Sequence, residues 1–216
     1  VIDITDDVLF GETNTLLVRL DNRDHPITGP KPMQNLDFNM HGGLYRDVYL
    51  ETKNPLHITD PILAGKVASG GIFITYPKVS ESSATIQIKT NIINEDKKDR
   101  SFHLIHELYK NDRLVLQFQS EEEPLKSGYD AENISELVIE NPSLWSPQSP
   151  TLYSLHTSVV SGNTTVDKQR NRIGIRTIKI EKEGFSINGK NMFLRGVNRH
   201  QEYPYIGYAL SNNAQY

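Results

Sequence analysis

Apolar and polar residues alternate along the middle of the chain. One face of a segment carries Ala84, Ile86, Ile88 and Ile92, and its other face carries Thr85, Gln87, Lys89 and Asn91. This period of two is typical of a half-buried strand, because successive side chains of a strand point to opposite faces of the sheet. Similar short runs recur at 72–76, 102–108, 114–118, 137–139 and 153–159. Strands without intervening helices predict an all-β, antiparallel sandwich of about seven strands.

The two ends of the chain differ from this middle part. Residues 13–20 and 44–50 are interpreted as extended strands on either side of a loop rich in Pro, Gly and Asn. Two strands and a loop cannot bury a core of their own, so we expect them to be the tail of a larger β domain.

Near the other end, the pair Asn188-Gly189 separates two apolar stretches within residues 185–194. An Asn-Gly pair in this setting is the strongest short-range signal for a β-hairpin. Residues 194–200 then begin apolar and finish polar, which predicts a strand with functional groups at its C-terminal end. That arrangement suits the first strand of a (β/α)8 barrel, where active sites gather on this face.

Charge and composition exclude several classes of partner. Lys and Arg total 23 against 27 Asp and Glu, for a net charge of -4, and no basic block could follow a phosphate backbone, so nucleic acid is not an expected partner. The apolar runs are far shorter than the roughly 20 residues that cross a bilayer, so no membrane partner is expected. The chain has no cysteine, which excludes a disulfide framework and a thiol nucleophile. Without an initiator Met or an apolar leader, we expect the N-terminus to be a cut, which leaves the compartment open.

Three phrases of the sequence resemble glycoside hydrolase family 2, and the resemblance spans nearly the whole chain. They are Gly42–Val48 (GGLYRDV), Asn141–Tyr153 (NPSLWSPQSPTLY), and a junction made of Arg172–Arg176, Gly184–Lys190 and Arg195–His200. The resemblance implies the C-terminal part of a sugar-binding jelly-roll domain at 1–52, an immunoglobulin-like β-sandwich domain at 53–177, and the N-terminal start of a catalytic TIM barrel at 178–216. A whole barrel needs roughly 250 residues, so we expect this one to be truncated.

The family resemblance also implies a retaining mechanism with one Glu as acid/base and a second as nucleophile. Such chemistry places the two carboxyl groups roughly 5 to 5.5 Å apart. In the family both glutamates follow on later barrel strands, beyond Tyr216. We therefore expect no catalytic residue in this chain and no activity from it alone, and we expect the parent β-galactosidase-like enzyme to act on terminal β-linked galactosides.

Four substrate-binding residues follow from the same resemblance. Asp47 matches the family aspartate that, in β-galactosidases, contacts the galactosyl hydroxyls and a sodium ion, and a carboxylate is suited to accept hydrogen bonds from vicinal hydroxyls. His200 matches a histidine that donates to a sugar hydroxyl. Arg195 and Asn198 belong to the same predicted strand and line the pocket or orient the glutamates. No cofactor is expected in the fragment, whereas the parent enzyme would use sodium or magnesium.

Alternatives stand beside these expectations. The family pattern has an acid directly after the histidine, whereas Gln201 follows His200 here, which leaves a β-glucuronidase or β-mannosidase parent open. From a different class, the chain would be a non-catalytic module that binds carbohydrate or protein. Asp47 would then be a strand-end carboxylate paired with Arg46, and His200 a solvated strand-end residue.

Three further groups invite functional interpretations. The run Glu121–Glu123 before Pro124 is predicted to be a solvated loop and not a catalytic pair. His103 and His106 would point to opposite faces of one strand, so they cannot bind one metal ion together. Trp145 lies among prolines, which favours a packing anchor over a platform for a sugar ring.

Overall fold

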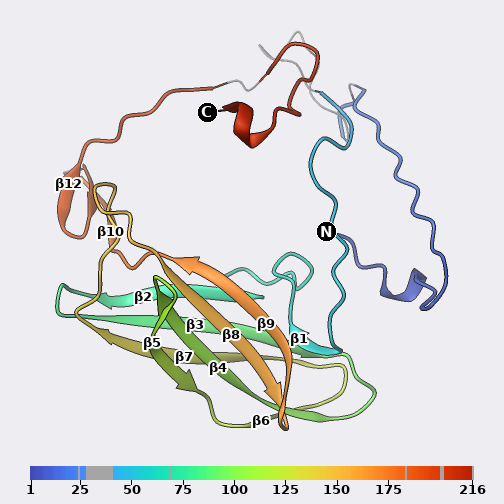
Figure 1. Cartoon of the computed structure of the whole chain (residues 1–216), viewed down its shortest axis with the longest axis horizontal. Coiled ribbons are helices and arrows are strands. Elements are labelled where there is room, and N and C mark those ends of the chain that lie inside the picture. The colour runs from blue at the N-terminus through green and yellow to red at the C-terminus, as the bar shows by residue number, and fades with distance from the viewer. Residues whose placement is uncertain (24, 28–40, 69, 183, 200–201, 216) are drawn as a thin grey trace. The chain divides into compact units, whose positions relative to one another are not determined.

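A computed structural model describes residues 1–23, 25–27, 41–68, 70–182, 184–199 and 202–215. None of these residues is in an α-helix, and the paired strands are all antiparallel (Figure 1). The chain divides into two compact units, which are described separately. The sandwich unit comprises Val1–Asp3 and Thr52–Leu194, and the terminal unit comprises Ile4–Glu51 and Arg195–Tyr216. No helix in the described ranges is long and apolar enough to span a membrane.

The first sheet of the sandwich is built around one long strand. It contains β1 (Leu56–Ile58), β2 (Ile72–Val79), β3 (Ser83–Asn94) and β7 (Asp130–Glu140). β7 pairs with nearly the whole of β3, while β2 and then β1 pair with successive parts of its opposite edge. The strand predicted from the alternation at 84–92 is therefore confirmed as the centre of the sheet, with Ile86 and Ile88 fully buried.

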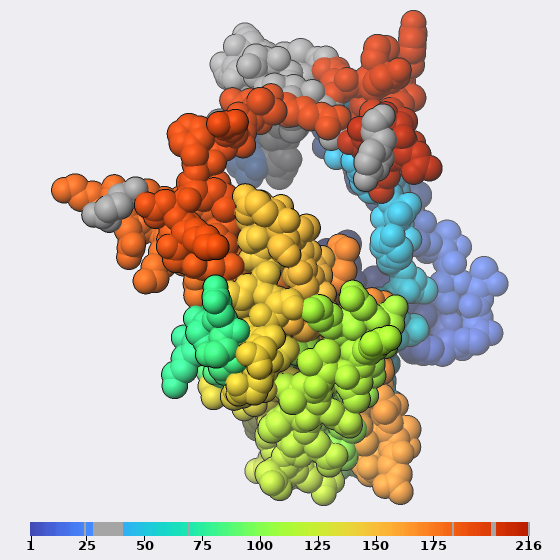
Figure 2. All heavy atoms as spheres, turned by 60° about the vertical axis from the view of Figure 1, so that its left-hand side comes forward, coloured from blue at the N-terminus to red at the C-terminus, as the bar shows by residue number. Residues whose placement is uncertain are grey.

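The second sheet faces the first (Figure 1). It contains β4 (Arg100–Lys110), β5 (Arg113–Gln119), β6 (Glu123–Leu125), β8 (Tyr153–Ser161) and β9 (Thr164–Ile173). β4 pairs with β8 on one side and with β5 and β6 on the other, and β9 extends the sheet beyond β8. On the face shown in Figure 2, the segments around residues 110–125 (lime) and 140–150 (gold) form one continuous surface.

The core lies between these two sheets. One cluster combines Ile86 of β3 and Leu137 of β7 with Leu108 and Leu155 of the facing sheet. A second cluster, around the fully buried Phe102, joins β1 and β3 to β4, β6 and β8. Inward-facing apolar residues from both sheets define an antiparallel β-sandwich, consistent with the expected immunoglobulin-like fold.

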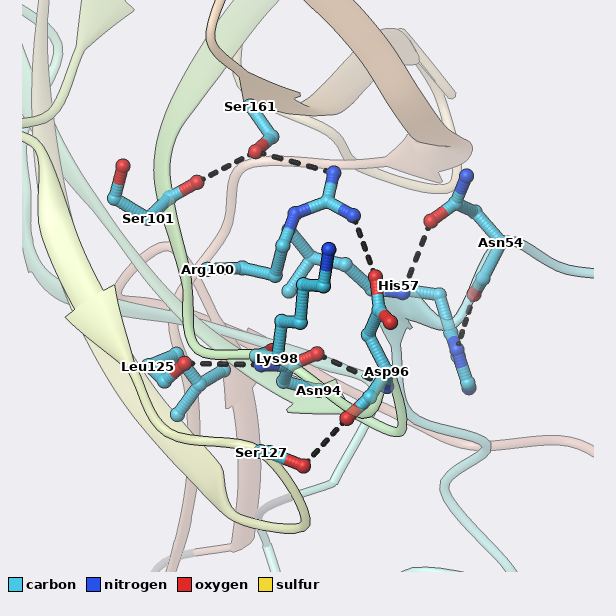
Figure 3. Close-up of polar contacts among 11 residues, drawn as sticks. Asn54, His57, Asn94, Asp96, Lys98, Arg100, Ser101, Leu125, Ser127 and Ser161 are labelled. Atoms are coloured by element: carbon cyan, nitrogen blue, oxygen red, sulfur yellow. Dashed lines mark hydrogen bonds and ion pairs between the residues drawn. The ribbon is translucent and has the colours of Figure 1, made fainter.

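Polar contacts close one end of the sandwich (Figure 3). The side-chain amide of Asn94 donates to the backbone oxygens of Lys98 and Leu125, at 2.9 and 3.0 Å. Arg100 lies 2.8 Å from the carboxylate of Asp96, and its other terminal nitrogen donates to Ser161 Oγ at 3.4 Å. These bonds satisfy backbone and side-chain groups that the turn after β3 would otherwise leave unpaired, so we assign the cluster a structural role.

The predicted hairpin at the Asn-Gly pair is confirmed. β10 (Ile178–Glu181), β11 (Gly184–Ile187) and β12 (Lys190–Met192) form a three-stranded sheet. Asn188 and Gly189 connect β11 to β12, and both have positive φ, at 50° and 73°. That backbone matches the type I′ turn that favours Asn-Gly.

The strands predicted in the terminal unit are not found. Residues 13–20, 44–50 and 194–199 are described, and none belongs to a strand. These predictions are wrong because apolar alternation marks a segment able to pair, whereas a strand forms only where a partner takes up its backbone groups. The regular elements described in this unit are two short 3-10 helices, η1 (Thr5–Asp7) and η3 (Asn212–Gln215).

Candidate functional site

Asp47 is an exposed carboxylate in the terminal unit. Its Oδ2 accepts a hydrogen bond of 3.0 Å from the hydroxyl of Tyr49. That bond, together with the negative charge of Asp47, raises the pKa of the Tyr49 phenol above its ordinary value. The guanidinium of Arg46 lies 5.7 Å from the centre of the Tyr45 ring, and no ion pair joins it to Asp47 within the described residues. The side chain of Asp47 is thus oriented by Tyr49 and accessible to a hydroxyl-bearing ligand.

Arg195 and Asn198 lie in the same compact unit as Asp47, although the whole sandwich unit separates them in the sequence. Both are exposed and stand in a segment without regular secondary structure. His200 lies outside the described residues. The unit therefore holds a carboxylate, a guanidinium and a side-chain amide, which together can accept from and donate to sugar hydroxyls.

A cluster that the sequence did not predict joins the two parts of the terminal unit. His41 Nε2 lies 2.8 Å from Glu202 Oε1, and the His41 ring meets Tyr208 edge-on with the ring centres 5.0 Å apart. Gly207 packs so closely that a Cβ there would come within 2.9 Å of the His41 ring. The sequence signals were His41 beside Gly42-Gly43 and the tyrosine-rich run from Tyr203 to Tyr208, but their proximity depends on the fold.

The histidines of β4 behave as predicted. His106 is fully buried in the sandwich and His103 lies at its surface, so they do not converge. His106 Nδ1 lies 3.0 Å from Thr157 Oγ1, while its Nε2 is buried without a hydrogen-bond partner. Burial lowers the pKa of His106 to about 4, so the ring is neutral near pH 7.

The acidic run and the tryptophan both have structural contacts. Glu123 belongs to β6 and accepts a 2.5 Å hydrogen bond from Asn133, so the predicted solvated loop is wrong at this residue and holds for the exposed Glu121. Trp145 is half-buried, with the guanidinium of Arg176 5.0 Å from the centre of its ring. The packing role predicted for Trp145 agrees with these contacts.

The described residues contain no group of three or more His, Cys, Asp or Glu side chains arranged to hold a metal ion. Asp47 by itself supplies carboxylate oxygen, a donor that suits hard cations. Further ligands would have to come from backbone oxygens, water, substrate or other residues.

A family comparison identifies the class of protein. The profile described as "Glycosyl hydrolases family 2" matches residues 69–176, half of the chain and most of the sandwich. The chain belongs to glycoside hydrolase family 2, which confirms the resemblance seen in the three sequence phrases.

Individual relatives carry two different activities in their names. A β-glucuronidase of Formosa agariphila is 31% identical over 90% of this chain and 20% of its own length. A β-galactosidase of Thermoanaerobacter pseudethanolicus is 29% identical over 99% of this chain and 27% of its own length. Among solved structures, Bacteroides uniformis β-glucuronidase 2 covalently bound to cyclophellitol-6-carboxylate aziridine matches with a TM-score of 0.79 and 32% identity, covering 97% of this chain and 25% of that one. The chain thus spans between a fifth and about a quarter of these relatives, and they support galactosidase and glucuronidase parents equally.

Proposed function

We propose that the protein containing this chain is a retaining exo-β-glycosidase that removes terminal, non-reducing β-D-galactose units. The observation that carries the proposal is the presence of Asp47, Arg195 and Asn198 in one compact unit of a family 2 chain. In this proposal the chain comprises the end of a sugar-binding domain at 1–52, the immunoglobulin-like sandwich at 53–177 and the start of a catalytic barrel at 178–216. Family membership favours this enzyme segment over a free-standing binding module.

The proposed role of Asp47 is to accept hydrogen bonds from hydroxyls of the terminal sugar. A carboxylate accepts through two oxygens, and the Tyr49 hydroxyl occupies only Oδ2. Charge-assisted hydrogen bonds of this kind are roughly twice as strong as neutral ones, so Asp47 can fix the orientation of the sugar. Arg195 and Asn198 supply donors to the same ligand or to the catalytic carboxylates. His200 would add a further donor, and a sodium ion would bind to Asp47 together with sugar oxygens.

A β-D-glucuronide is the second candidate substrate. It is favoured by the β-glucuronidase of Formosa agariphila and by the Bacteroides uniformis structure, each of which covers at least 90% of this chain. A glucuronide differs from a galactoside by a carboxylate on the sugar ring, which requires a cationic or strongly donating partner. The described terminal unit offers Arg46 and Arg195 as exposed cations, and the same residues could equally contact neutral hydroxyls.

Kinetics of the full-length protein test the proposal. We expect hydrolysis of nitrophenyl β-D-galactoside, with a lower kcat/KM for the corresponding glucuronide and mannoside. Nuclear magnetic resonance of the first product should show a β anomer, because a retaining mechanism passes through two displacements. An α product, or no hydrolysis of any β-glycoside, would overturn the proposal, and a preference for the glucuronide would select the second candidate. The 216-residue chain alone is expected to be inactive on every substrate.

A further inference from the structure

The terminal unit contains a hollow of about 530 Å³ that no proposed role has yet used. Its wall is formed by His41, Gly42 and Tyr45 on one side and by residues 202–208 on the other. Ligand pockets in proteins commonly have volumes of about 300–1,000 Å³, so this hollow could hold a sugar ring. The ion pair between His41 and Glu202 joins its two sides.

Residues 203–207 form a tight loop that presents an aromatic side chain. Tyr203 and Gly207 exchange backbone hydrogen bonds of 3.2 and 2.9 Å, which close the loop. At its tip Tyr205 has a φ of 70°, and its exposed fraction is 107% of the reference value. A bulky residue rarely adopts this left-handed backbone, and an exposed phenol ring gains no packing in return. Backbone strain of this kind persists where the surrounding structure enforces it, and it is concentrated at ligand sites.

The chemistry of the wall matches a carbohydrate. Tyr45, Tyr203 and Tyr205 are each at least 44% exposed, so their rings offer apolar surfaces together with phenolic hydroxyls. A pyranose ring combines an apolar face of C–H groups with hydroxyls at its edge, and amphipathic aromatic side chains suit both. The carboxylate of Glu202 and the ring of His41 add an acceptor and a donor for those hydroxyls.

The hollow also lies close to the proposed site for the terminal sugar. Tyr45 is two residues from Asp47, so their Cα atoms are at most about 7 Å apart. We propose that the hollow is a subsite for the second sugar unit of a β-linked oligosaccharide, with Tyr205 as its stacking platform. This inference rests on the proposed function, because Asp47 must hold the terminal sugar for the second unit to reach the hollow.

Binding of uncleavable ligands to the full-length protein tests the subsite. The probes are thio-linked β-disaccharides with galactose or glucuronic acid as the terminal unit, and the methyl thioglycosides of the same sugars. Calorimetry should give a Kd for the disaccharide that rises about tenfold in Tyr205→Ala, the scale expected for one lost aromatic contact. The Kd of the methyl thioglycoside should not change. The matched control is Tyr129→Ala, which removes a tyrosine of the sandwich unit that is 65% exposed.

The outcomes separate the subsite from the proposed function. An unchanged disaccharide Kd in Tyr205→Ala, or an equal loss for both ligands, would overturn the subsite even if the enzyme is active. Disaccharide binding that depends on Tyr205 in a protein that hydrolyses no β-glycoside would support the subsite and overturn the proposed function. If neither ligand binds to the wild-type protein, the hollow is a packing surface and the subsite is wrong.

Discussion

The sandwich unit and the terminal unit treat their apolar residues in opposite ways. In the sandwich, Ile86 and Phe102 are fully buried between two hydrogen-bonded sheets. In the terminal unit, Leu17 and Tyr49 are 91% and 81% exposed, and the segments that contain them have no regular structure. The difference indicates a division of roles, in which the sandwich supplies folding stability and the terminal unit supplies the groups that contact substrate.

Removing a core side chain should show the largest effect of this division. We expect Phe102→Ala to lower the free energy of unfolding by about 3–5 kcal/mol, because it removes buried apolar surface and leaves a cavity. Leu17→Ala should change it by less than about 0.5 kcal/mol, as expected for an exposed side chain. Urea unfolding followed by the fluorescence of Trp145, the single tryptophan of the chain, measures both. Equal effects of the two changes would contradict the comparison.

The opposite result is expected for Asp47. In the full-length enzyme, Asp47→Asn should lower kcat/KM by about a hundredfold, because it weakens charge-assisted hydrogen bonds worth roughly 1.5–3 kcal/mol. Its urea midpoint should stay that of the wild type, since the carboxylate is exposed. Asp6→Asn is the control, because Asp6 is an exposed aspartate of the same unit. Unchanged kinetics in Asp47→Asn would remove Asp47 from the proposed site.

Acid should weaken the sandwich through His106. Burial lowers the pKa of His106 to about 4 from an ordinary value of 6.5, so the unfolded chain binds more protons between these values. Stability therefore decreases as the pH falls through this window, by about 2 kcal/mol between pH 7.5 and pH 5 for this residue. Urea unfolding at both values should show that difference missing in His106→Leu and kept in His103→Leu. An identical pH dependence in all three proteins would show that His106 is not responsible.

The sequence predicted the sandwich better than the terminal unit for a physical reason. Alternation at 84–92 identified the centre of the first sheet, because a strand with one buried face repeats with a period of two. The turn at Asn188 was equally legible, since its backbone requirement is local. The segments at 13–20 and 44–50 have similar apolar patterns, yet a pattern does not supply the partner that completes a strand.

The candidate site was predictable only where it follows family motifs. Asp47, Arg195, Asn198 and His200 came from the resemblance, and their roles remain predictions. The contact between His41 and Glu202 joins residues 161 positions apart, a pairing that no local spacing indicates. Family motifs thus identified the residues proposed to contact the terminal sugar, while the hollow beside them required the structure.

The connection between the small sheet and the sandwich places three demands on a single position. The backbone of Asn188 is left-handed, with a φ of 50°. Its Oδ1 accepts from the Thr177 backbone N–H at 3.0 Å, and its Nδ2 donates to the Trp145 backbone oxygen at 3.0 Å. Aspartate would keep the acceptor and lose the donor, and glycine would keep only the backbone freedom. Substitutions tolerated in this family should therefore be narrower at this turn than at many positions of the buried core, where apolar residues of similar volume can replace one another.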